Sequence, residues 1–255
     1  MSVKVLNNVR GVNYDSAFWR KRAEHYNSLE WANHQLYLDA FIRAGGFSKT
    51  DIVLDVGTGT GIIAHAVAPL AKQVIGLDKS QDMLDHSNWN GNLYFVKRDI
   101  LDPIFKDEVF DKLTARQVFH HILRNTQEAM NECRRVLKKG GRMVLSEGVP
   151  PTLEVKQDYI EIFRLKEKRL TFMKEDLILL MEKAGFKNIQ VDIVWLKEMS
   201  IRNWLVNSGL PKSIQERIFD LHVNAGDYFK RAYRMKEADG DCLIDMKMAI
   251  LVGEK

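Results

Sequence analysis

The sequence predicts an α/β fold, in which a doubly wound, mostly parallel sheet carries helices on both faces. Strand and helix patterns alternate along most of the chain, which is typical of a parallel sheet built from βαβ units. The apolar run that ends at Asp55 leads directly into a glycine-rich turn, Gly57–Gly61, and then into a helix pattern. A second apolar run ends at Asp78. Glycines and acids at successive strand ends are typical of sheets that bind nucleotides there.

Seven strand patterns are expected, each short and rich in apolar or β-branched residues. In chain order they are Ile52–Asp55, Gln73–Leu77, Leu93–Lys97, Val109–Thr114, Arg142–Ser146, Ile189–Leu196 and Cys242–Val252. Helix patterns occupy the gaps, beginning with Ile62–Leu70. The helix patterns Asn125–Leu137 and Lys174–Lys183 precede glycines, which commonly end helices because they accept a positive φ.

Three helix-rich segments exceed this sheet: residues 1–50, 150–170 and 199–238. They adjoin the carboxyl edge of the predicted sheet, where such folds bind ligands, so we expect them to form a lid and not a second domain. The predicted organisation is a single domain, 1–255, made of an N-terminal helical lid, 1–50, a cofactor-binding half, 51–147, and a substrate-side half, 148–255, that contains the helical insertion 199–238.

Composition excludes several classes of protein. The net charge of +4 is spread along the chain, and the densest basic stretch, Arg164–Arg169, is interpreted as a solvated helix face and not as a nucleic-acid footprint. No apolar run reaches the roughly 18–20 residues of a membrane span, and the N-terminus lacks a signal-peptide pattern. Cys133 and Cys242 lie on different predicted elements, so no disulfide is expected. These features predict a cytoplasmic protein.

The glycine-rich turn predicts a nucleoside cofactor. Glycines allow backbone N–H groups and a helix N-terminus to approach a ligand closely, and a carboxylate at Asp78 is placed to accept both hydroxyls of a ribose. Dinucleotide-binding folds use the spacing G-x-G-x-x-G. Here the third glycine, Gly61, comes one residue early, and Ile62 stands where that pattern has glycine. The spacing therefore disfavours NAD.

The motif Asp55-x-Gly57-x-Gly59-x-Gly61, together with Asp78, resembles the first motif of class I S-adenosylmethionine-dependent methyltransferases. The resemblance covers roughly residues 35–200 and is greatest to the branch that includes the ubiquinone and menaquinone C-methyltransferases. It implies a Rossmann-like, seven-stranded sheet whose last strand is antiparallel, S-adenosylmethionine as the cofactor, and a small-molecule acceptor. The insertion 199–238 departs from the compact end of the quinone enzymes.

The resemblance also implies a cofactor site at the strand ends. Its expected members are Asp55, Gly57, Thr58, Gly59, Gly61, Asp78, Lys79, Met83, Asp99, Ile100, Arg116 and Gln117. Structural alternatives remain for four of them: Asp55 as a helix cap, Met83 as a core residue, and Asp78 and Asp99 as turn residues. The Asp/Asn-Pro-Pro-Tyr/Phe motif of nucleobase N-methyltransferases is absent from the end of the fourth strand, so methylation of a nucleobase amino group is not expected.

Three residues are candidates for a catalytic base. His120 and His121 follow the fourth strand, and Glu147 ends the fifth. An unshifted imidazole titrates near neutrality and can accept a proton at working pH, although either histidine could instead serve packing. The histidines lack the spacing of a metal site, so no metal is expected.

Aromatic residues are expected to enclose the acceptor. Tyr14, Trp19 and Tyr26 lie in the N-terminal segment, and Trp204 lies in the insertion with Tyr228, Phe229 and Tyr233. Much aromatic surface favours a planar or lipophilic molecule, although these side chains could instead pack the helices on the sheet. The sequence thus predicts methyl transfer to carbon or oxygen of a small molecule. An RNA or protein methyltransferase, or a protein that binds the cofactor without transferring methyl, remains an alternative, and the oligomeric state is not predicted.

Overall fold

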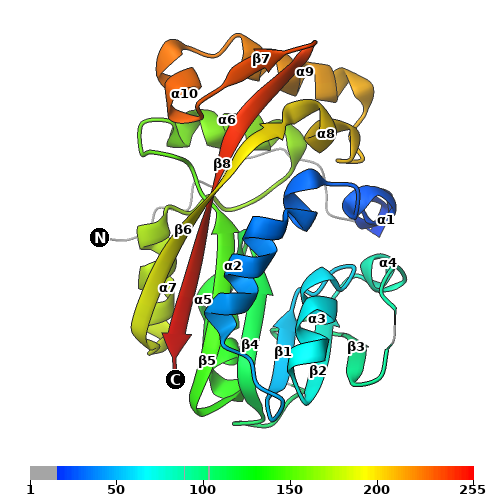
Figure 1. Ribbon diagram of the computed structural model, residues 1–255, viewed down its shortest axis with the longest axis vertical. Coiled ribbons are helices and arrows are strands. Elements are labelled where there is room, and N and C mark those ends of the chain that lie inside the picture. Colours follow the sequence, from blue (N-terminus) through cyan, green and yellow to red (C-terminus); the bar gives the residue numbers. More distant parts are fainter. Residues whose placement is uncertain (1–15, 89, 103) are drawn as a thin grey trace.

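The computed structural model describes residues 16–255 apart from 89 and 103, so Tyr14 lies outside the described residues. The described chain forms an eight-stranded sheet in the order β3-β2-β1-β4-β5-β8-β6, with β7 beside β8 (Figure 1). The strands are β1 Ile52–Val56, β2 Gln73–Asp78, β3 Leu93–Lys97, β4 Phe110–Arg116, β5 Leu137–Gly148, β6 Lys187–Ser200, β7 Lys236–Ala238 and β8 Asp241–Glu254.

Strands β1 to β5 pair in parallel, and β8 is antiparallel to both β5 and β6. The prediction of a mostly parallel sheet with an antiparallel last strand is confirmed. The strand count of seven is wrong, because β7 forms an eighth strand that pairs with β8 through a turn at Asp239 and Gly240, both with positive φ. All three β7 residues are exposed, so this strand carries no hydrophobic alternation that would reveal it.

Ten α-helices are seen in the described residues, besides the short 3₁₀ helices Glu30–Asn33, Ala68–Leu70 and Phe119–His121. The α-helices are α1 Ser16–Tyr26, α2 Gln35–Gly45, α3 Ile62–Val67, α4 Gln81–Leu84, α5 Thr126–Val136, α6 Lys156–Lys166, α7 Lys174–Ala184, α8 Ile201–Val206, α9 Lys212–Val223 and α10 Asp227–Ala232. Helices α2 and α3 cover one face of the sheet, and α5 and α7 cover the other. The neighbours Val53 and Leu54 on β1 belong to these two opposite cores, as strand alternation requires. Within the described ranges no helix has the length and apolar character of a membrane span.

A third core lies beyond the carboxyl edge of the parallel strands. Strands β6 and β8 are 14 residues long and continue past the end of β5, toward the top of Figure 1. The first half of β8 packs with α6, α8, α9 and α10 around residues such as Ile218 and Phe229. Strand β8 therefore supports the predicted insertion 199–238 above the site.

Two boundaries expected from the sequence are corrected. Helix α2, which falls in the predicted N-terminal lid, is a core helix: Tyr37 and Phe41 are fully buried, and the Tyr37 hydroxyl lies 2.7 Å from the Ser146 hydroxyl of β5. The expected glycine stop after α5 is also wrong, because the chain passes from Val136 directly into β5. Gly140, with φ 72°, lies within that strand instead of ending the helix.

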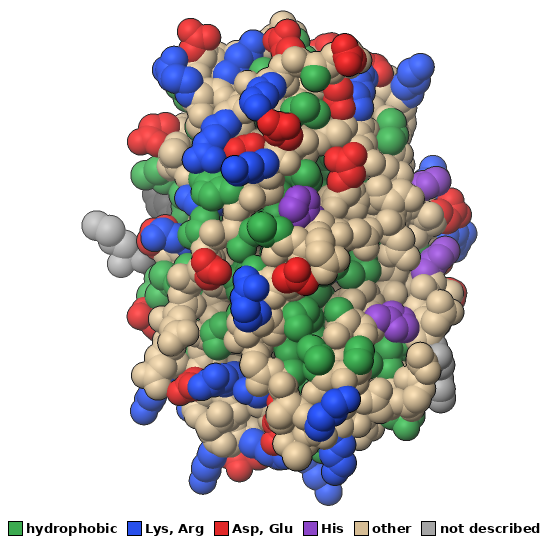
Figure 2. All heavy atoms as spheres, in the orientation of Figure 1, with side chains coloured by type: hydrophobic (Ala, Val, Ile, Leu, Met, Phe, Trp, Pro, Cys, Tyr) green, Lys and Arg blue, Asp and Glu red, His purple; other side chains and the backbone are tan. Residues whose placement is uncertain are grey.

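Charged side chains of both signs are interspersed on the face of the molecule seen in Figure 2. Among the described residues charged side chains form ion pairs, such as Arg142 with Glu254 at 2.7 Å and Arg202 with Glu216 at 2.8 Å. No large area of a single sign is visible on this face. An extended nucleic-acid surface would need one.

Candidate active site

The turn between β1 and α3 forms the floor of the site. Gly57, Gly59 and Gly61 all have positive φ, at 63°, 58° and 86°, a region that other residues adopt only with strain. A Cβ at Gly57 would also lie 2.4 Å from a methyl group of Val118. The sequence therefore needs glycine here both for the backbone conformation and for the close approach of the loop after β4.

Asp55 ties this turn to the neighbouring strand. Its two carboxylate oxygens accept hydrogen bonds from the hydroxyls of Thr58 and Thr114, each at 2.7 Å. Burial raises the pKa of Asp55 to about 6. One oxygen thus binds the turn and the other binds β4. This arrangement favours an orienting role for Asp55.

Asp78 lies opposite the turn at the end of β2. Its carboxylate accepts the backbone N–H groups of Gly59 at 2.9 Å and Ser80 at 2.8 Å. Burial raises the pKa of this carboxyl above its ordinary value. Each carboxylate oxygen has a second lone pair, so Asp78 retains the capacity to accept two further hydroxyl groups. The Ser80 hydroxyl in turn accepts from the Met83 N–H and begins α4.

One cavity of about 440 Å³ extends from the glycine turn to the loop after β4. The predicted cofactor residues that line it are Asp55, Gly57, Thr58, Gly59, Asp78, Lys79, Met83, Asp99, Ile100, Arg116 and Gln117. Gly61 is absent from the lining, since its Cα position faces the Phe95 ring, 2.9 Å from where a Cβ would stand. A backbone cradle without side chains, next to a buried carboxylate, fits the methionine and ribose parts of S-adenosylmethionine.

Arg116 and Gln117 connect the end of β4 to the N-terminal segment. Arg116 donates to the Ala32 carbonyl at 2.8 Å. The Gln117 side chain donates to the Tyr37 hydroxyl at 3.2 Å and accepts from the Gly148 N–H at 3.2 Å. Both side chains are therefore already engaged with protein groups, and their predicted contact with the cofactor stays a prediction.

Glu147 holds His120 and the loop before it in place. Its Oε1 accepts the backbone N–H groups of Val118, Phe119 and His120 at 3.1, 2.7 and 3.3 Å, and its Oε2 lies 2.6 Å from Nδ1 of His120. Burial raises the pKa of Glu147 to about 7, while Arg169 and these backbone amides act in the opposite direction. Glu147 is fully buried and is not among the cavity-lining residues, so we interpret it as a positioning residue and not as the base itself.

His120 and His121 both line the cavity. Burial and the Arg169 guanidinium lower the pKa of His120 well below its ordinary value. Burial and the neighbouring His120 do the same for His121, whose ring meets Trp19 edge-on at 5.0 Å between ring centres. Both imidazoles are therefore neutral at pH 7. With Glu147 ionised, the His120 ring donates its Nδ1–H to that carboxylate and keeps the lone pair of Nε2 for a proton.

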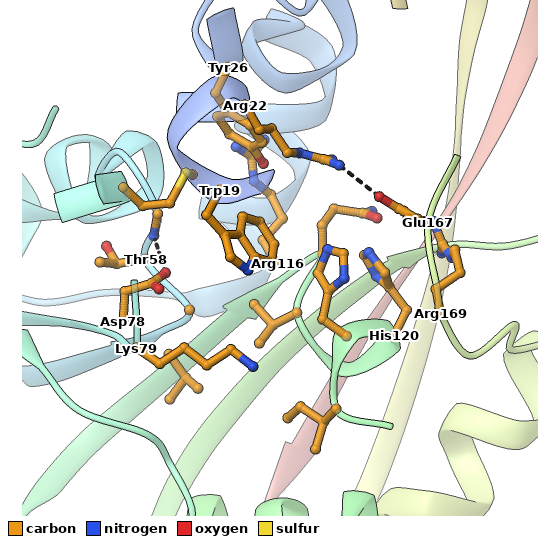
Figure 3. A pocket seen from close by; sticks show the side chains of 18 of the residues that line it. Trp19, Arg22, Tyr26, Thr58, Asp78, Lys79, Arg116, His120, Glu167 and Arg169 are labelled. Atoms are coloured by element: carbon orange, nitrogen blue, oxygen red, sulfur yellow. Dashed lines mark hydrogen bonds and ion pairs between the residues drawn. The ribbon is translucent and has the colours of Figure 1, made fainter. Parts of the chain in front are cut away.

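A charged cluster that sequence reasoning missed adjoins these histidines (Figure 3). Glu167 pairs with Arg22 at 2.7 Å, Lys166 at 2.6 Å and Arg169 at 3.5 Å. Lys166 and Glu167 are 2% and 3% exposed, so the interpretation of Arg164–Arg169 as a solvated helix face is wrong. Helix α6 ends at Lys166, and the chain beyond it brings Glu167 and Arg169 to the cavity. The glutamate within that basic run was the one signal of an internal ion-pair network.

The pKa values of Glu167 and Lys166 are both lowered, but for different reasons. Burial alone would raise the pKa of the Glu167 carboxyl, but Lys166 and Arg22 outweigh it and hold that pKa well below the ordinary value. Burial and the nearby Arg22 lower the pKa of Lys166 to about 7.

Ligating atoms of His120, His121 and Glu167 lie within 4.8 Å of one another. Because three cations already pair with the Glu167 carboxylate, we assign this group to the ion-pair network and not to a metal.

The aromatic wall differs in part from the prediction. Trp19, Tyr26 and Trp204 line the cavity, and Trp19 lies between Asp78 and His120 in the view of Figure 3. Tyr228, Phe229 and Tyr233 were wrongly placed in this wall: Tyr228 is exposed, and the other two are buried in the third core. Their place is taken by Tyr159 and Phe163 of α6.

Comparison with known proteins gives consistent matches. Residues 54–145 match the family model of a methyltransferase domain. The chain is 30% identical over 197 residues to a demethylmenaquinone methyltransferase of Staphylococcus aureus, spanning 65% of this chain and 80% of that protein. It is 25% identical to an uncharacterized methyltransferase of Bacillus subtilis, YcgJ, over 80% of this chain and 83% of that protein.

Solved structures share the fold. The crystal structure of YcgJ superposes with a TM-score of 0.77 at 22% identity and covers 87% of this chain and 99% of that one. A phosphoethanolamine N-methyltransferase of Haemonchus contortus, solved in complex with S-adenosylmethionine, gives a TM-score of 0.60 at 19% identity and covers 91% of this chain and 57% of that one.

Proposed function

Because the chain belongs to the class I S-adenosylmethionine-dependent methyltransferases, in the branch of the demethylmenaquinone enzymes, we propose that it methylates a carbon or oxygen atom of a small, planar molecule. The single observation that carries the proposal is the continuous cavity. It joins the glycine turn and Asp78 at one end to His120, Trp19 and Phe163 at the other. An acceptor placed there would be enclosed with the cofactor and shielded from water.

When bound, S-adenosylmethionine supplies an already activated methyl group. The residues of the chain then have to position the acceptor, exclude water and, for a hydroxyl or acidic C–H acceptor, remove a proton. Asp78 and the turn Gly57–Gly59 would hold the cofactor. His120, oriented by Glu147 at 2.6 Å, would take the acceptor's proton on Nε2. His121 would position the acceptor together with Trp19.

Helix α1 and the insertion 199–238 would act as a lid over this cavity. Trp19 and Tyr26 of α1 and Trp204 of α8 line it. The insertion contacts the N-terminal segment through the Asn203 side chain, which accepts the Glu30 N–H and donates to the Ser28 carbonyl. Asn27 also accepts from the Thr60 hydroxyl of the glycine turn at 2.7 Å. These few polar contacts join segments that must separate for ligands to enter.

If these segments are a lid, hydrogen exchange in α1 and in 199–238 should slow when S-adenosylhomocysteine and acceptor are bound, because lids belong to the less stable parts of a fold. Strand β4 serves as the internal reference, since the sheet should be protected in both states. Mass-spectrometric exchange would measure this. Equal protection of both segments with and without ligands would instead indicate a permanently packed scaffold.

The spacing of the glycines predicts the choice of cofactor. S-adenosylmethionine and S-adenosylhomocysteine should bind with micromolar-range affinity, whereas NAD should not bind appreciably, because Ile62 stands where the dinucleotide pattern needs glycine. Calorimetric titration of all three compounds measures the difference. NAD bound as tightly as S-adenosylhomocysteine would contradict the proposed cofactor site.

Product analysis tests the proposed function itself. The purified protein would be incubated with S-adenosylmethionine and panels of phenols, enols, RNA and protein acceptors, with S-adenosylhomocysteine as the common readout. Turnover confined to the small molecules is expected, because α1, α6 and α8 line the cavity and the face in Figure 2 mixes charges of both signs. Turnover with RNA or protein alone would contradict it, and binding without any product would indicate a cofactor-binding protein. A cytoplasmic location and a small-molecule partner are part of the same proposal.

A further inference from the structure

A second, smaller cavity of about 50 Å³ adjoins the main one within the third core, toward the top of Figure 1. The two cavities share five lining residues, namely Gly148, Tyr159, Phe163, Trp204 and Met246. The other walls of the smaller cavity come mainly from α6, α8, α9 and β8. It is therefore a side pocket of the main cavity, next to the place proposed for the acceptor.

His222 of α9 brings a fixed hydrogen-bond acceptor to the side pocket. The residue is 3% exposed, and its Nδ1 lies 2.8 Å from the Ile218 carbonyl. Burial lowers the pKa of His222 to about 4, so the ring is neutral. A carbonyl oxygen can only accept, so Nδ1 carries the proton and Nε2 carries the lone pair.

This lone pair has no partner among the described residues. Nε2 is not one of the fully buried polar atoms without a partner, so it is reached from the side pocket that the ring lines. The Trp204 ring meets the imidazole edge-on at 6.2 Å between ring centres. An acceptor held by a helix and a neighbouring ring has a defined direction, which a ligand can match.

Tyr233 supplies the second polar atom of the side pocket. The residue is 5% exposed, and burial holds the pKa of its hydroxyl well above the ordinary value, so the phenol stays protonated. Within the part of the chain that the structure describes, the hydroxyl has no hydrogen-bond partner. Other polar groups of the pocket are engaged: Lys247 donates to the Pro151 carbonyl at 2.8 Å, and the Ser200 hydroxyl donates to Asp241.

The size of the side pocket limits what can enter it. A water molecule needs roughly 10–15 Å³ on this measure, and a dry cavity of about 150 Å³ is needed for a benzene ring. A pocket of about 50 Å³ therefore takes a group of a few non-hydrogen atoms and neither a ring nor a long chain. Its apolar walls favour a short carbon branch, and its two unpartnered polar atoms favour a hydroxyl at the end of that branch.

We propose that the side pocket is a specificity subsite for the acceptor, and that it binds a short side group that ends in a hydroxyl. The ligand O–H would donate to Nε2 of His222, and its oxygen would accept from the Tyr233 hydroxyl. This inference rests on the proposed methyl transfer and names a feature of its acceptor. Trp204, His222 and Tyr233 all belong to the insertion 199–238, so the proposal also gives that insertion a role in substrate choice.

Matched phenols test the subsite on the protein saturated with S-adenosylhomocysteine. Calorimetry would compare (2-hydroxyethyl)phenol with propylphenol, which differ only in a terminal hydroxyl or methyl, as the 3- and the 4-substituted isomers. In at least one isomer pair the hydroxyethyl compound should bind about 10-fold more tightly, because a single neutral hydrogen bond has that effect. Burial of apolar surface alone predicts the opposite order. Equal affinity in both pairs, tighter binding of the propyl compounds, or no binding of any probe would overturn the proposal.

Variants locate the preference. His222→Leu should remove most of it and leave the affinity for propylphenol nearly unchanged, His222→Gln should keep part of it because the amide oxygen can accept, and Tyr233→Phe should lower it less. His86→Leu is the matched control, because His86 is exposed on the surface. Binding of S-adenosylhomocysteine shows that each variant is folded. A preference that survives in both His222→Leu and Tyr233→Phe would overturn the assignment.

A change of volume provides a second variant that leaves the polar atoms in place. Ile244 of β8 lines the side pocket and not the main cavity. Ile244→Phe should fill the pocket and weaken both substituted phenols, while the affinity for unsubstituted phenol should stay the same. If the substituted phenols bind Ile244→Phe as they bind the wild type, their side groups lie elsewhere and the subsite is wrong.

Nitrogen-15 NMR of the histidine rings reads the same contact directly. Near neutral pH His222 should show the neutral Nδ1–H tautomer, and its signals are assigned by their loss in His222→Gln. Addition of (2-hydroxyethyl)phenol should shift the Nε2 resonance, because the lone pair accepts a hydrogen bond, and propylphenol should not shift it. An Nε2–H tautomer, or an Nε2 resonance that moves with neither probe, would overturn the proposal.

The binding preference is measured without methyl transfer, so the two proposals can fail separately. A preserved preference for the hydroxyl probe together with absent methyl transfer would contradict the proposed function and leave the subsite supported. Methyl transfer to small molecules without any preference for the hydroxyl group would contradict the subsite alone.

Discussion

Replacing His120 with asparagine should lower kcat by about 10²–10⁴-fold, the usual contribution of a general base. The affinity for S-adenosylhomocysteine should stay nearly unchanged, because His120 lies at the acceptor end of the cavity and not at the glycine turn. His121→Asn should have a smaller effect, since the lone pair oriented by Glu147 belongs to His120. His86→Asn is the control, because His86 is exposed on the surface.

The pH dependence sharpens this prediction. A neutral imidazole is needed as the base, and burial and Arg169 hold the pKa of His120 well below 6.5, so the ring itself stays neutral at pH 6.5. The Glu147 carboxylate that accepts its Nδ1–H has a pKa of about 7. We therefore expect turnover to fall as the pH drops through the pKa of Glu147, because its protonation removes the acceptor that orients His120, and not through the pKa of an unshifted histidine. A normal rate in both His120→Asn and His121→Asn would show that catalysis rests on positioning alone.

A change at Glu147 tests the Glu147–His120 pair in a second way. Glu147→Gln keeps the size of the side chain but weakens the acceptor for the Nδ1–H of His120 and for three backbone amides. Its effect on kcat should therefore follow that of His120→Asn and should be smaller than additive in the double variant, because both changes disrupt one unit. Additive losses of kcat in the double variant would show that Glu147 and His120 act independently.

The cofactor end of the site was predictable from the sequence because it is local. Gly57 and Gly59 are adjacent to strand β1, and Asp78 ends the next strand in the chain. Strand ends in a parallel sheet meet at one edge, so short motifs are sufficient to place these residues together. For the same reason strands β1 to β4, which carry clear apolar runs, were predicted to within two residues, whereas β5 and β6 extend further than predicted.

The acceptor end was only partly predictable because it is assembled from distant segments. Arg22 and Glu167 are 145 residues apart in the chain, and no local pattern connects them. A run such as Arg164–Arg169 looks like a solvated face when only its composition is known. It turns inward because helix α6 ends at Lys166, where β8 and α8 bring Met246 and Trp204 to the same cavity.

The aromatic residues illustrate the same limit. Trp19 and Trp204 line the cavity as expected, whereas Phe229 packs with Tyr233 at 4.5 Å between ring centres in the third core. Lining the cavity and packing in the third core both need a ring on the inner side of a helix. The sequence pattern is therefore the same for both roles. The tertiary arrangement of α10 on the upper part of β8 decides between them.

Replacing Asp78 with alanine should weaken the binding of S-adenosylmethionine by about 2–4 kcal/mol, because two ribose hydroxyls lose a charged acceptor. Asp78→Asn should cost less, since the amide keeps one acceptor oxygen. Asp85→Ala is the control, because Asp85 is exposed beyond α4 and does not line the cavity. Calorimetric titration would measure all three affinities.

Asp78 also accepts the N–H groups of Gly59 and Ser80, so its removal could act by loosening the turn and not through the ribose. The 2′-deoxy analogue of S-adenosylhomocysteine separates the two causes. If the carboxylate binds the ribose, the wild-type protein should discriminate against the analogue, and Asp78→Ala should lose most of that discrimination, since the partner of the missing hydroxyl is gone. If both proteins discriminate equally, the effect of Asp78 is on the loop, and the ribose assignment is wrong.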